Sequence, residues 1–279
     1  MKRICMGVVL YNPNLKMLEN IQSFIEDVSK IYIYDNSLNS HQDMFKKIKS
    51  SIEIEYMWNG QNDGLSHALN CICKKAFLDQ YDYIFTMDQD SIFVSCSIKN
   101  MVEFANRIQT PIGIIAPKIQ PYFNEKEIDL LKDQPLRKEY KKKKFAITSG
   151  SLINLNILDR LGYFEEKFFI EHIDTEYCIR LCNQGYKIIE LENSILLQRA
   201  GNSQVKKIMG KEVHPLYANP IRGYYLFRNH IFILRKYGKS VYQYTAPLYK
   251  TLIKTLLFED HKFNRIYYYI KGALDGVKL

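Results

Sequence analysis

The sequence predicts an α/β fold in which a largely parallel sheet carries helices on both faces. Short runs rich in Ile, Val, Tyr and Phe alternate with segments of helical apolar spacing through the first two-thirds of the chain. Alternation of this kind requires crossover connections, which place helices over both faces of a parallel sheet. The 279 residues, 47% of them hydrophobic and 25% charged, are enough to bury one sizeable core.

The elements follow in chain order. Strands are expected at Ile4–Leu10, Ile31–Tyr34, Ile52–Met57, Tyr83–Met87 and Ile112–Ala116. Helices are expected between them at Leu15–Val28, Gly64–Leu78 and Ser97–Arg107. Farther along the chain, the apolar spacing predicts helices at about 154–161 and 174–184 and a strand at Lys187–Leu191. Residues 121–144, which end in a run of lysines, are expected to be a solvated loop. The chain after residue 205 is expected to be helical.

The basic excess lies at the C-terminal end. The net charge is +9, yet residues 1–204 carry 25 basic and 26 acidic side chains, whereas residues 205–279 carry 14 and 4. We therefore divide the chain into a domain at 1–204 and a basic, tyrosine-rich helical extension at 205–279. Apolar residues between Thr245 and Leu257 predict an amphipathic helix. Its apolar face either packs on the first domain or lies on an anionic membrane surface.

Several classes of protein are excluded. The six cysteines lack zinc-site spacing, and reduced thiols suit the cytoplasm. The apolar run at the N-terminus is too short for a signal peptide, and no stretch approaches the roughly 18 apolar residues of a membrane span. No dinucleotide fingerprint, P-loop or nucleic-acid-binding motif is present, so no nucleic-acid partner is expected. We expect a cytoplasmic protein, or one bound peripherally to the inner face of the plasma membrane.

Polar residues follow four of the predicted strands, where open parallel sheets bind ligands. They are Tyr11-Asn12, Asp35-Asn36-Ser37, Asn59 to Gly64, and Asp88-Gln89-Asp90. Taken singly, each segment is compatible with an ordinary turn. Because residues two apart in extended chain point the same way, Asp88 and Asp90 can also face one point and bind Mg or Mn beside a diphosphate.

The densest acidic cluster contains Glu171, Asp174 and Glu176 at the start of a predicted helix. Carboxylates in a first helical turn stabilise unpaired backbone N–H groups, which is the structural interpretation. The catalytic interpretation is a general base held beneath the apolar run Phe168-Phe169-Ile170.

The order of these motifs resembles glycosyltransferase family 2, inverting enzymes of the GT-A fold. The matching segments are Val8–Asn12, Asp35–Ser37, Asn62–Asn70, Asp88–Asp90, Thr148–Ser151 and Glu171–Glu176 followed by Arg180. Further segments resemble the rhamnosyltransferase branch, namely Met87–Ser91, Phe169–Cys178, Arg222–Asn229 and Gly272–Gly276. The resemblance covers roughly residues 4–276 and implies a Rossmann-like mixed sheet flanked by helices, with a C-terminal helical extension.

The resemblance also implies roles for the matching residues. Asp174 corresponds to the catalytic base, and Glu176 to the acid beside it. The residues implied in nucleotide-sugar binding are Tyr11, Asn12, Asp35, Asn36, Asn62, Gly64, Asn70, Asp88 and Gln89. The acceptor side is implied for Gly150, Ser151 and Glu171, and diphosphate contacts for Arg222 and Arg228. Asp90, with Asp88, corresponds to the site for Mg or Mn.

Two positions depart from the family pattern. Glu171 stands where the rhamnosyltransferase branch usually has Asp, and Gln198 stands where a His commonly assists the metal. Gln is a weaker metal ligand than imidazole, and His214 farther along the chain is either an exposed loop residue, which we favour, or a substitute ligand.

The activity implied is metal-dependent inverting transfer of L-rhamnose from dTDP-rhamnose. The acceptor is a hydroxyl of a lipid-linked or oligosaccharide substrate in bacterial surface-polysaccharide synthesis. The alternatives are another donor (UDP-galactofuranose or a UDP-hexose) and a catalytically inactive nucleotide-sugar-binding relative.

Overall fold

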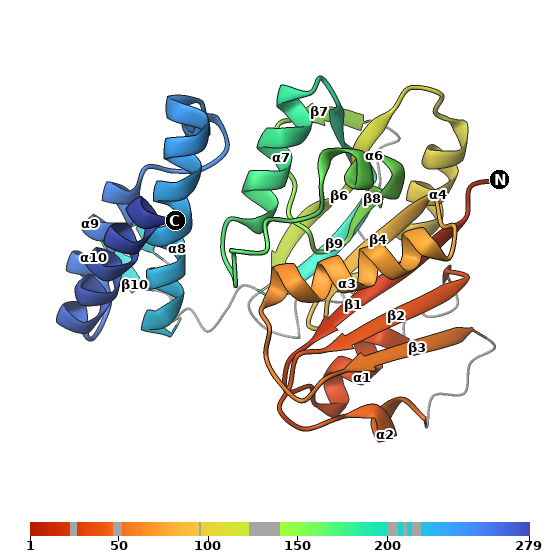
Figure 1. Ribbon diagram of the computed structural model, residues 1–279, viewed down its shortest axis with the longest axis horizontal. Helices are drawn as coiled ribbons and strands as arrows, with labels where there is room; N and C mark the ends of the chain where they lie inside the picture. The colour runs from red at the N-terminus through yellow and green to blue at the C-terminus, as the bar shows by residue number, and fades with distance from the viewer. Residues whose placement is uncertain are drawn as a thin grey trace.

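A mixed sheet forms the centre of the fold, and its first half is parallel (Figure 1). The computed structural model describes residues 1–22, 27–46, 52–94, 96–122, 140–199, 206–208, 211–213 and 219–279. The parallel half contains, in spatial order, β3 (Glu53–Trp58), β2 (Lys30–Asp35), β1 (Ile4–Leu10) and β4 (Tyr83–Asp88). Since β1 pairs with β2 on one side and β4 on the other, the carboxyl ends of β1 and β4 form a switch point suited to ligand binding.

The second half of the sheet is mainly antiparallel. The strands there are β8 (Ser151–Asn154), β6 (Ile112–Tyr122), β9 (Lys187–Arg199), β5 (Ile92–Phe93) and β7 (Tyr140–Lys143). β8 runs antiparallel to both β4 and β6, whereas β6 and β9 are parallel. The mixed sheet implied by the family resemblance is therefore confirmed. The largely parallel sheet predicted from strand and helix alternation holds only for the first half, because β5, β7 and β8 each pair antiparallel with their neighbours.

Helices cover both faces of the sheet, as predicted (Figure 1). They are α1 (Leu15–Gln22), α2 (Gln42–Phe45), α3 (Leu65–Leu78), α4 (Ser97–Arg107), α6 (Leu155–Leu161) and α7 (Ile173–Asn183). One buried apolar cluster contains Ile72 of α3, Leu158 of α6 and Ile179 of α7. A second contains Ile21 of α1 and Met101 of α4. The two clusters correspond to the apolar stripes that predicted these helices.

The segment 121–144 differs from the predicted loop. β6 continues through Tyr122, and Tyr140–Lys143 forms the edge strand β7 paired with β9. Residues 123–139 lie outside the described part. Lys141 pairs with Glu192 at 2.7 Å and Lys143 with Glu190 at 3.1 Å. Lysines are common on exposed edge strands, where their charge discourages pairing with another chain, so a lysine run and a strand are compatible.

The C-terminal extension contains α8 (Pro220–Tyr237), α9 (Leu248–Phe258) and α10 (Lys262–Lys278). A hairpin of β10 (Lys206–Ile208) and β11 (Lys211–Val213) precedes them, so the expectation of helix throughout is wrong for those residues. The α8 side chain Phe232 packs edge to face on Phe168, with ring centroids 5.3 Å apart. α10 lies so close to α8 that a Cβ at Gly272 would overlap the Tyr224 backbone.

No helix in the described ranges is both long and apolar enough to cross a membrane.

Candidate active site

A cleft of about 580 Å³ opens at the switch point between β1 and β4. Its walls come from the ends of these strands, the turn before α3, the turn before β8, the segment before α7 and the start of α8. Ten of the predicted site residues line it, namely Tyr11, Asn36, Asn62, Gly64, Asp88, Gln89, Asp90, Glu171, Asp174 and Arg222. The fold thus brings together segments far apart in the sequence.

The carboxylates of Asp88 and Asp90 lie at the end of β4 in a partly desolvated position. Burial raises the pKa of Asp88 to about 6, and the charge of Asp90 adds to the shift, while Ser149 and Arg222 oppose it. Burial also raises the pKa of Asp90, against the charge of Arg199. Two carboxylates that repel each other in a cleft are stabilised by a divalent cation.

The metal-ligand set is small within the described ranges. No group of three or more His, Cys, Asp or Glu side chains is clustered there, so a cation would depend on two carboxylates and on ligands from the substrate. Gln198 lines the same cleft. β5 pairs with β9 through Ile92 and Leu197, so Asp90 and Gln198 lie just beyond the same end of this antiparallel pair. The Gln198 amide oxygen is a donor type that Mg accepts. His214 lies outside the described residues.

Asp174 sits in the first turn of α7, where the preceding backbone is strained. Glu171 and His172 have φ of 68° and 62°, in the left-handed region that costs non-glycine residues about 1–3 kcal/mol. The Asn229 amide of α8 stabilises this segment by donating to the Ile170 and Glu171 carbonyls at 2.8 Å each. Strained backbone held by neighbouring groups is typical of functional sites.

The environment of Asp174 makes it a suitable proton acceptor near neutral pH. Burial raises its pKa to about 6, and the charges of Glu171 and Asp88 add to the shift. The backbone N–H of Thr175 opposes it by donating to Asp174 Oδ1 at 2.8 Å. A carboxylate with a pKa just below the working pH is ionised yet basic enough to accept a proton.

Arg222 brings a positive charge from α8 into the cleft. Its Nε and Nη2 contact Glu171 Oε1 at 2.7 Å and 2.6 Å, and its charge reaches Asp88. The extension therefore contributes side chains, Arg222 among them, to a cleft that is lined mostly by the 1–204 domain.

Several cleft residues were given no individual role from the sequence, although Phe169 belongs to the apolar run expected above the base. Phe169 and Tyr225 stack in the lining at 5.1 Å, and Ser149 lines the cleft where the neighbouring Gly150 and Ser151 were expected. His172 also lines it and packs against His230 at 5.3 Å. Burial, with a contribution from His230, lowers the pKa of His172 to about 3, so this ring adds no charge beside Asp174. Phe169, Ser149 and His172 each lie one or two residues from a predicted site residue in the sequence, and this was the signal that could have identified them as cleft residues.

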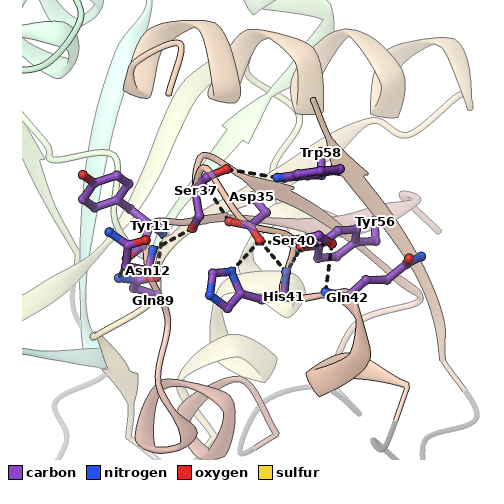
Figure 2. Close-up of polar contacts among 10 residues, drawn as sticks. All are labelled: Tyr11, Asn12, Asp35, Ser37, Ser40, His41, Gln42, Tyr56, Trp58 and Gln89. Carbon is purple, nitrogen blue, oxygen red and sulfur yellow. Dashed lines mark hydrogen bonds and ion pairs between the residues drawn. The ribbon is translucent and has the colours of Figure 1, made fainter. Parts of the chain in front are cut away.

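Asp35 is not brought to the cleft. Its fully buried carboxylate accepts hydrogen bonds from the Ser37 N–H at 3.0 Å, from the backbone and ring of His41, and from the Tyr56 hydroxyl (Figure 2). Burial works to raise its pKa, but these hydrogen bonds together lower it. The ionised Asp35 thus holds the loop after β2. Trp58 supports the same loop by donating from Nε1 to the Ser37 carbonyl at 3.0 Å.

Tyr11 and Gln89 join the loops that follow β1 and β4. The Tyr11 N–H donates to Gln89 Oε1 at 2.9 Å, and Gln89 Nε2 donates to the Tyr11 carbonyl at 3.0 Å. Asn12 lies just outside the cleft lining, with its backbone N–H donating to Ser37 Oγ at 2.7 Å (Figure 2). The two hydrogen bonds between Tyr11 and Gln89 hold the backbone of Tyr11, whose ring is exposed, beside the cleft.

Five further predicted residues do not line the cleft. Asn70 is buried and exchanges hydrogen bonds with the Phe164 backbone at 2.9 Å. The Ser151 hydroxyl donates to the Ile147 carbonyl, and the Gly150 N–H donates to the Thr86 carbonyl, because β8 begins there. Arg228 donates to the Lys167 carbonyl and stacks over Tyr225. Glu176 is buried between α7 and α8. The described contacts of these five residues are with other parts of the protein, and their implied roles stay predictions.

The chain is similar to known glycosyltransferases in sequence. Residues 7–162 match the family model described as "Glycosyl transferase family 2". The dTDP-rhamnosyl transferase RfbF of Shigella flexneri is 26% identical over 290 residues, covering 97% of this chain and 94% of that protein.

Two solved structures show the same fold. GalNAc-T7 with UDP, GalNAc and Mn²⁺ aligns with a TM-score of 0.64 at 13% identity, over 100% of this chain and 56% of that one. S. aureus TarS 1-349 in complex with UDP-GlcNAc aligns with a TM-score of 0.56 at 12% identity, over 97% of this chain and 72% of that one.

Proposed function

The chain belongs to glycosyl transferase family 2, and we propose that it is a metal-dependent inverting enzyme that transfers L-rhamnose from dTDP-rhamnose to an acceptor hydroxyl. The similarity to RfbF over nearly the full length of both chains supports this donor. The observation that supports the reaction best is that Asp174, Asp88, Asp90 and Arg222 line one cleft. We propose a lipid-linked or oligosaccharide acceptor of bacterial surface-polysaccharide synthesis.

Asp174 acts as the general base in this proposal. It accepts the proton of the acceptor hydroxyl while that oxygen attacks the anomeric carbon from the face opposite the diphosphate. The bond from the anomeric carbon to the phosphate oxygen breaks in the same displacement, so the anomeric configuration inverts. The transition state has the oxocarbenium character known from glycoside chemistry. Glu171, three residues before Asp174, stands on the acceptor side.

The leaving diphosphate needs positive charge. Arg222 lies in the cleft and is held there by Glu171, so its guanidinium is oriented before substrate binds. Asp90 and Asp88 would hold Mg or Mn, and the Gln198 amide is available beside them. A bound divalent cation supplies Lewis-acid stabilisation of the diphosphate. The raised pKa values of both aspartates, caused first by burial, support this assignment because a cation removes the repulsion.

The nucleotide portion of the donor would lie between the loops after β1 and β2. The loops after β1 and β2 contribute Tyr11 and Asn36 to the cleft, and the loops after β3 and β4 add Asn62 and Gln89. Gly64 lets the Phe169 backbone approach this part of the cleft closely, because a Cβ there would lie 2.7 Å from the Phe169 carbonyl oxygen. Asp35 supports this part of the cleft from beneath through the loop that contains Asn36.

A donor panel tests the proposed reaction. We expect release of nucleoside diphosphate from dTDP-rhamnose in the presence of Mg or Mn, and loss of release after chelation. Faster release from UDP-galactofuranose or a UDP-hexose would replace the proposed donor. Binding of a nucleotide sugar with no turnover of any donor, in the presence of either metal and an acceptor mixture, would favour the inactive nucleotide-sugar-binding alternative.

The pH dependence of transfer tests Asp174. Because protonation removes its ability to accept a proton, kcat/KM should fall by about tenfold for each pH unit below the pKa of Asp174, which burial raises above its ordinary value. The charges that act on Asp174 are those of Glu171 and Asp88, and Glu171 is itself paired with Arg222. Glu171→Gln removes one repelling charge and is expected to move this limb to lower pH. Glu103→Gln, on the exposed face of α4, is the control and should leave the limb in place. A flat profile between pH 5 and 8 would contradict the assignment.

A further inference from the structure

An exposed apolar stripe runs along α10. Its members recur at alternating spacings of four and three residues, which places them on one side of the helix, and each is more than half exposed. They are Phe263 at 93%, Tyr267 at 60%, Ile270 at 57%, Leu274 at 60% and Val277 at 56%. The opposite side is buried, with Tyr269 stacked on Phe227 of α8 at 4.4 Å and Gly276 in close contact with the Arg228 backbone. The stripe is therefore the face left over after α10 has packed.

α9 presents a second stripe of the same kind. Its exposed apolar residues are Tyr249, Ile253, Leu256 and Leu257. The buried side of α9 faces α10, because the Thr255 hydroxyl lies 2.9 Å from the Tyr269 hydroxyl. Both helices lie on the side of α8 that faces away from the sheet (Figure 1). The described contact of α9 is thus with α10, and its four apolar residues stay exposed. Stripes of this size mark an interaction surface.

The charge beside these stripes is positive. Residues 248–279 contain six basic and three acidic side chains. Two of the acids are engaged, since Glu259 is buried beside Arg265 at 3.5 Å and Asp275 accepts from the Tyr224 hydroxyl at 3.0 Å. At 100° per residue, Lys271 and Lys278 fall along one flank of the α10 stripe. The surface thus combines aromatic and aliphatic side chains with lysines.

We propose that α9 and α10 dock this enzyme on an anionic lipid surface. Apolar side chains flanked by lysines suit the boundary between headgroups and acyl chains, where Phe and Tyr also partition. A second copy of the chain would bring lysines against lysines, so charge complementarity favours the lipid. The inference rests on the proposed function in one respect, since a lipid-linked acceptor would be presented at that surface.

The connection to the cleft runs through α8. Arg222 and Tyr225 line the cleft, and Gly223 between them packs so closely on Tyr269 of α10 that a Cβ would overlap its ring. The docking surface and the cleft are therefore built on opposite sides of one helix. An acceptor anchored in the lipid would be delivered near the groups that activate it.

Vesicle flotation tests the docking surface. The full chain should float with vesicles of equal parts phosphatidylglycerol and phosphatidylcholine and should remain behind with phosphatidylcholine alone. Ile270→Gln with Leu274→Gln should weaken binding by roughly tenfold or more, which corresponds to about 1.4 kcal/mol. The matched control is Leu38→Gln with Leu78→Gln, which changes two exposed leucines, 70% and 75% accessible, on the other part of the molecule. It should float like the unchanged chain. Binding should also decrease as salt rises.

Two outcomes would overturn the proposal. One is equal flotation of the stripe variant and the control. The other is an unchanged chain that binds neither kind of vesicle but forms a dimer in sedimentation equilibrium. If the stripe variant does not form that dimer, the surface binds a second copy of the chain instead. Donor hydrolysis measured in the same samples separates this inference from the proposed function. The stripe variant should hydrolyse donor at the unchanged rate, whereas a wrong donor assignment would abolish hydrolysis and leave flotation intact.

Discussion

Asp174→Asn is expected to reduce sugar transfer by about 10²–10⁴-fold, the range attributed to general-base catalysis. The amide keeps the shape of the side chain, and its oxygen can still accept from the Thr175 N–H, which lies at 2.8 Å from Asp174 Oδ1. The start of α7 should therefore be preserved. The substitution removes a charge whose pKa is raised by burial and by Glu171 and Asp88, so it should not lower stability at neutral pH. Only the proton acceptor is lost.

Transfer rate and donor affinity together check this prediction. Donor affinity, measured by calorimetry in the presence of metal, should stay close to that of the unchanged protein. Asp159→Asn is the matched control, since Asp159 belongs to α6 and bonds Tyr163 at 3.1 Å outside the cleft. Weakened donor binding with transfer retained would remove Asp174 from the role of base.

Glu176→Ala is expected to destabilise the protein by about 3 kcal/mol, the cost typical of breaking a buried ion pair by deleting one partner. Glu176 is 1% exposed. Its carboxylate accepts from Arg180 Nε at 2.8 Å, Lys236 Nζ at 3.0 Å and the Tyr237 hydroxyl at 2.6 Å. Arg180 retains backbone carbonyl partners without Glu176, whereas the Tyr237 hydroxyl has no second hydrogen-bond partner among the described residues. The interaction ties α7 to α8.

Urea unfolding measures the loss, and turnover per folded molecule decides the role. Glu165→Gln, which removes a charge 3.8 Å from the same Lys236, is the control and should cost less than about 1 kcal/mol. Glu176→Gln should keep near-normal turnover because Glu176 does not line the cleft. A folded Glu176→Gln protein without activity would instead restore the catalytic role that the family resemblance implies.

The contrast between Asp174 and Glu176 shows where sequence motifs stop being informative. Both belong to one acidic cluster, but residues two apart on a helix point to nearly opposite sides. Asp174 therefore faces the cleft and Glu176 faces α8. Asp35 and Gly150 lie outside the cleft lining for a different reason. Each occupies the expected place in the chain, yet Asp35 is enclosed by Tyr56 and His41, and Gly150 leads into β8.

Elements with a strong local pattern were predicted best. The strand Ile4–Leu10 and the helix Ser97–Arg107 have the predicted bounds, because the strand is a short continuous apolar run and the helix has a periodic apolar face, both visible within the segment itself. β5, β7 and β8 were missed, and they are two to four residues long. Such short strands depend on the partner strand, and a single sequence contains no signal for pairing with β9 or β4.

The sequence by itself determined the family, the alternation of strands and helices, and the gathering of polar residues after β1 and β4. These features are local, or follow from the rule that parallel strands present their carboxyl ends at one edge. The tertiary structure alone decided that Glu176 joins two helices and that Glu171 holds Arg222, which the family resemblance implies at the diphosphate, in the cleft. It also decided that the apolar stripes of α9 and α10 stay exposed. The physical reason is that burial and charge pairing depend on which surfaces meet, and an amphipathic helix specifies an apolar face without specifying what covers it.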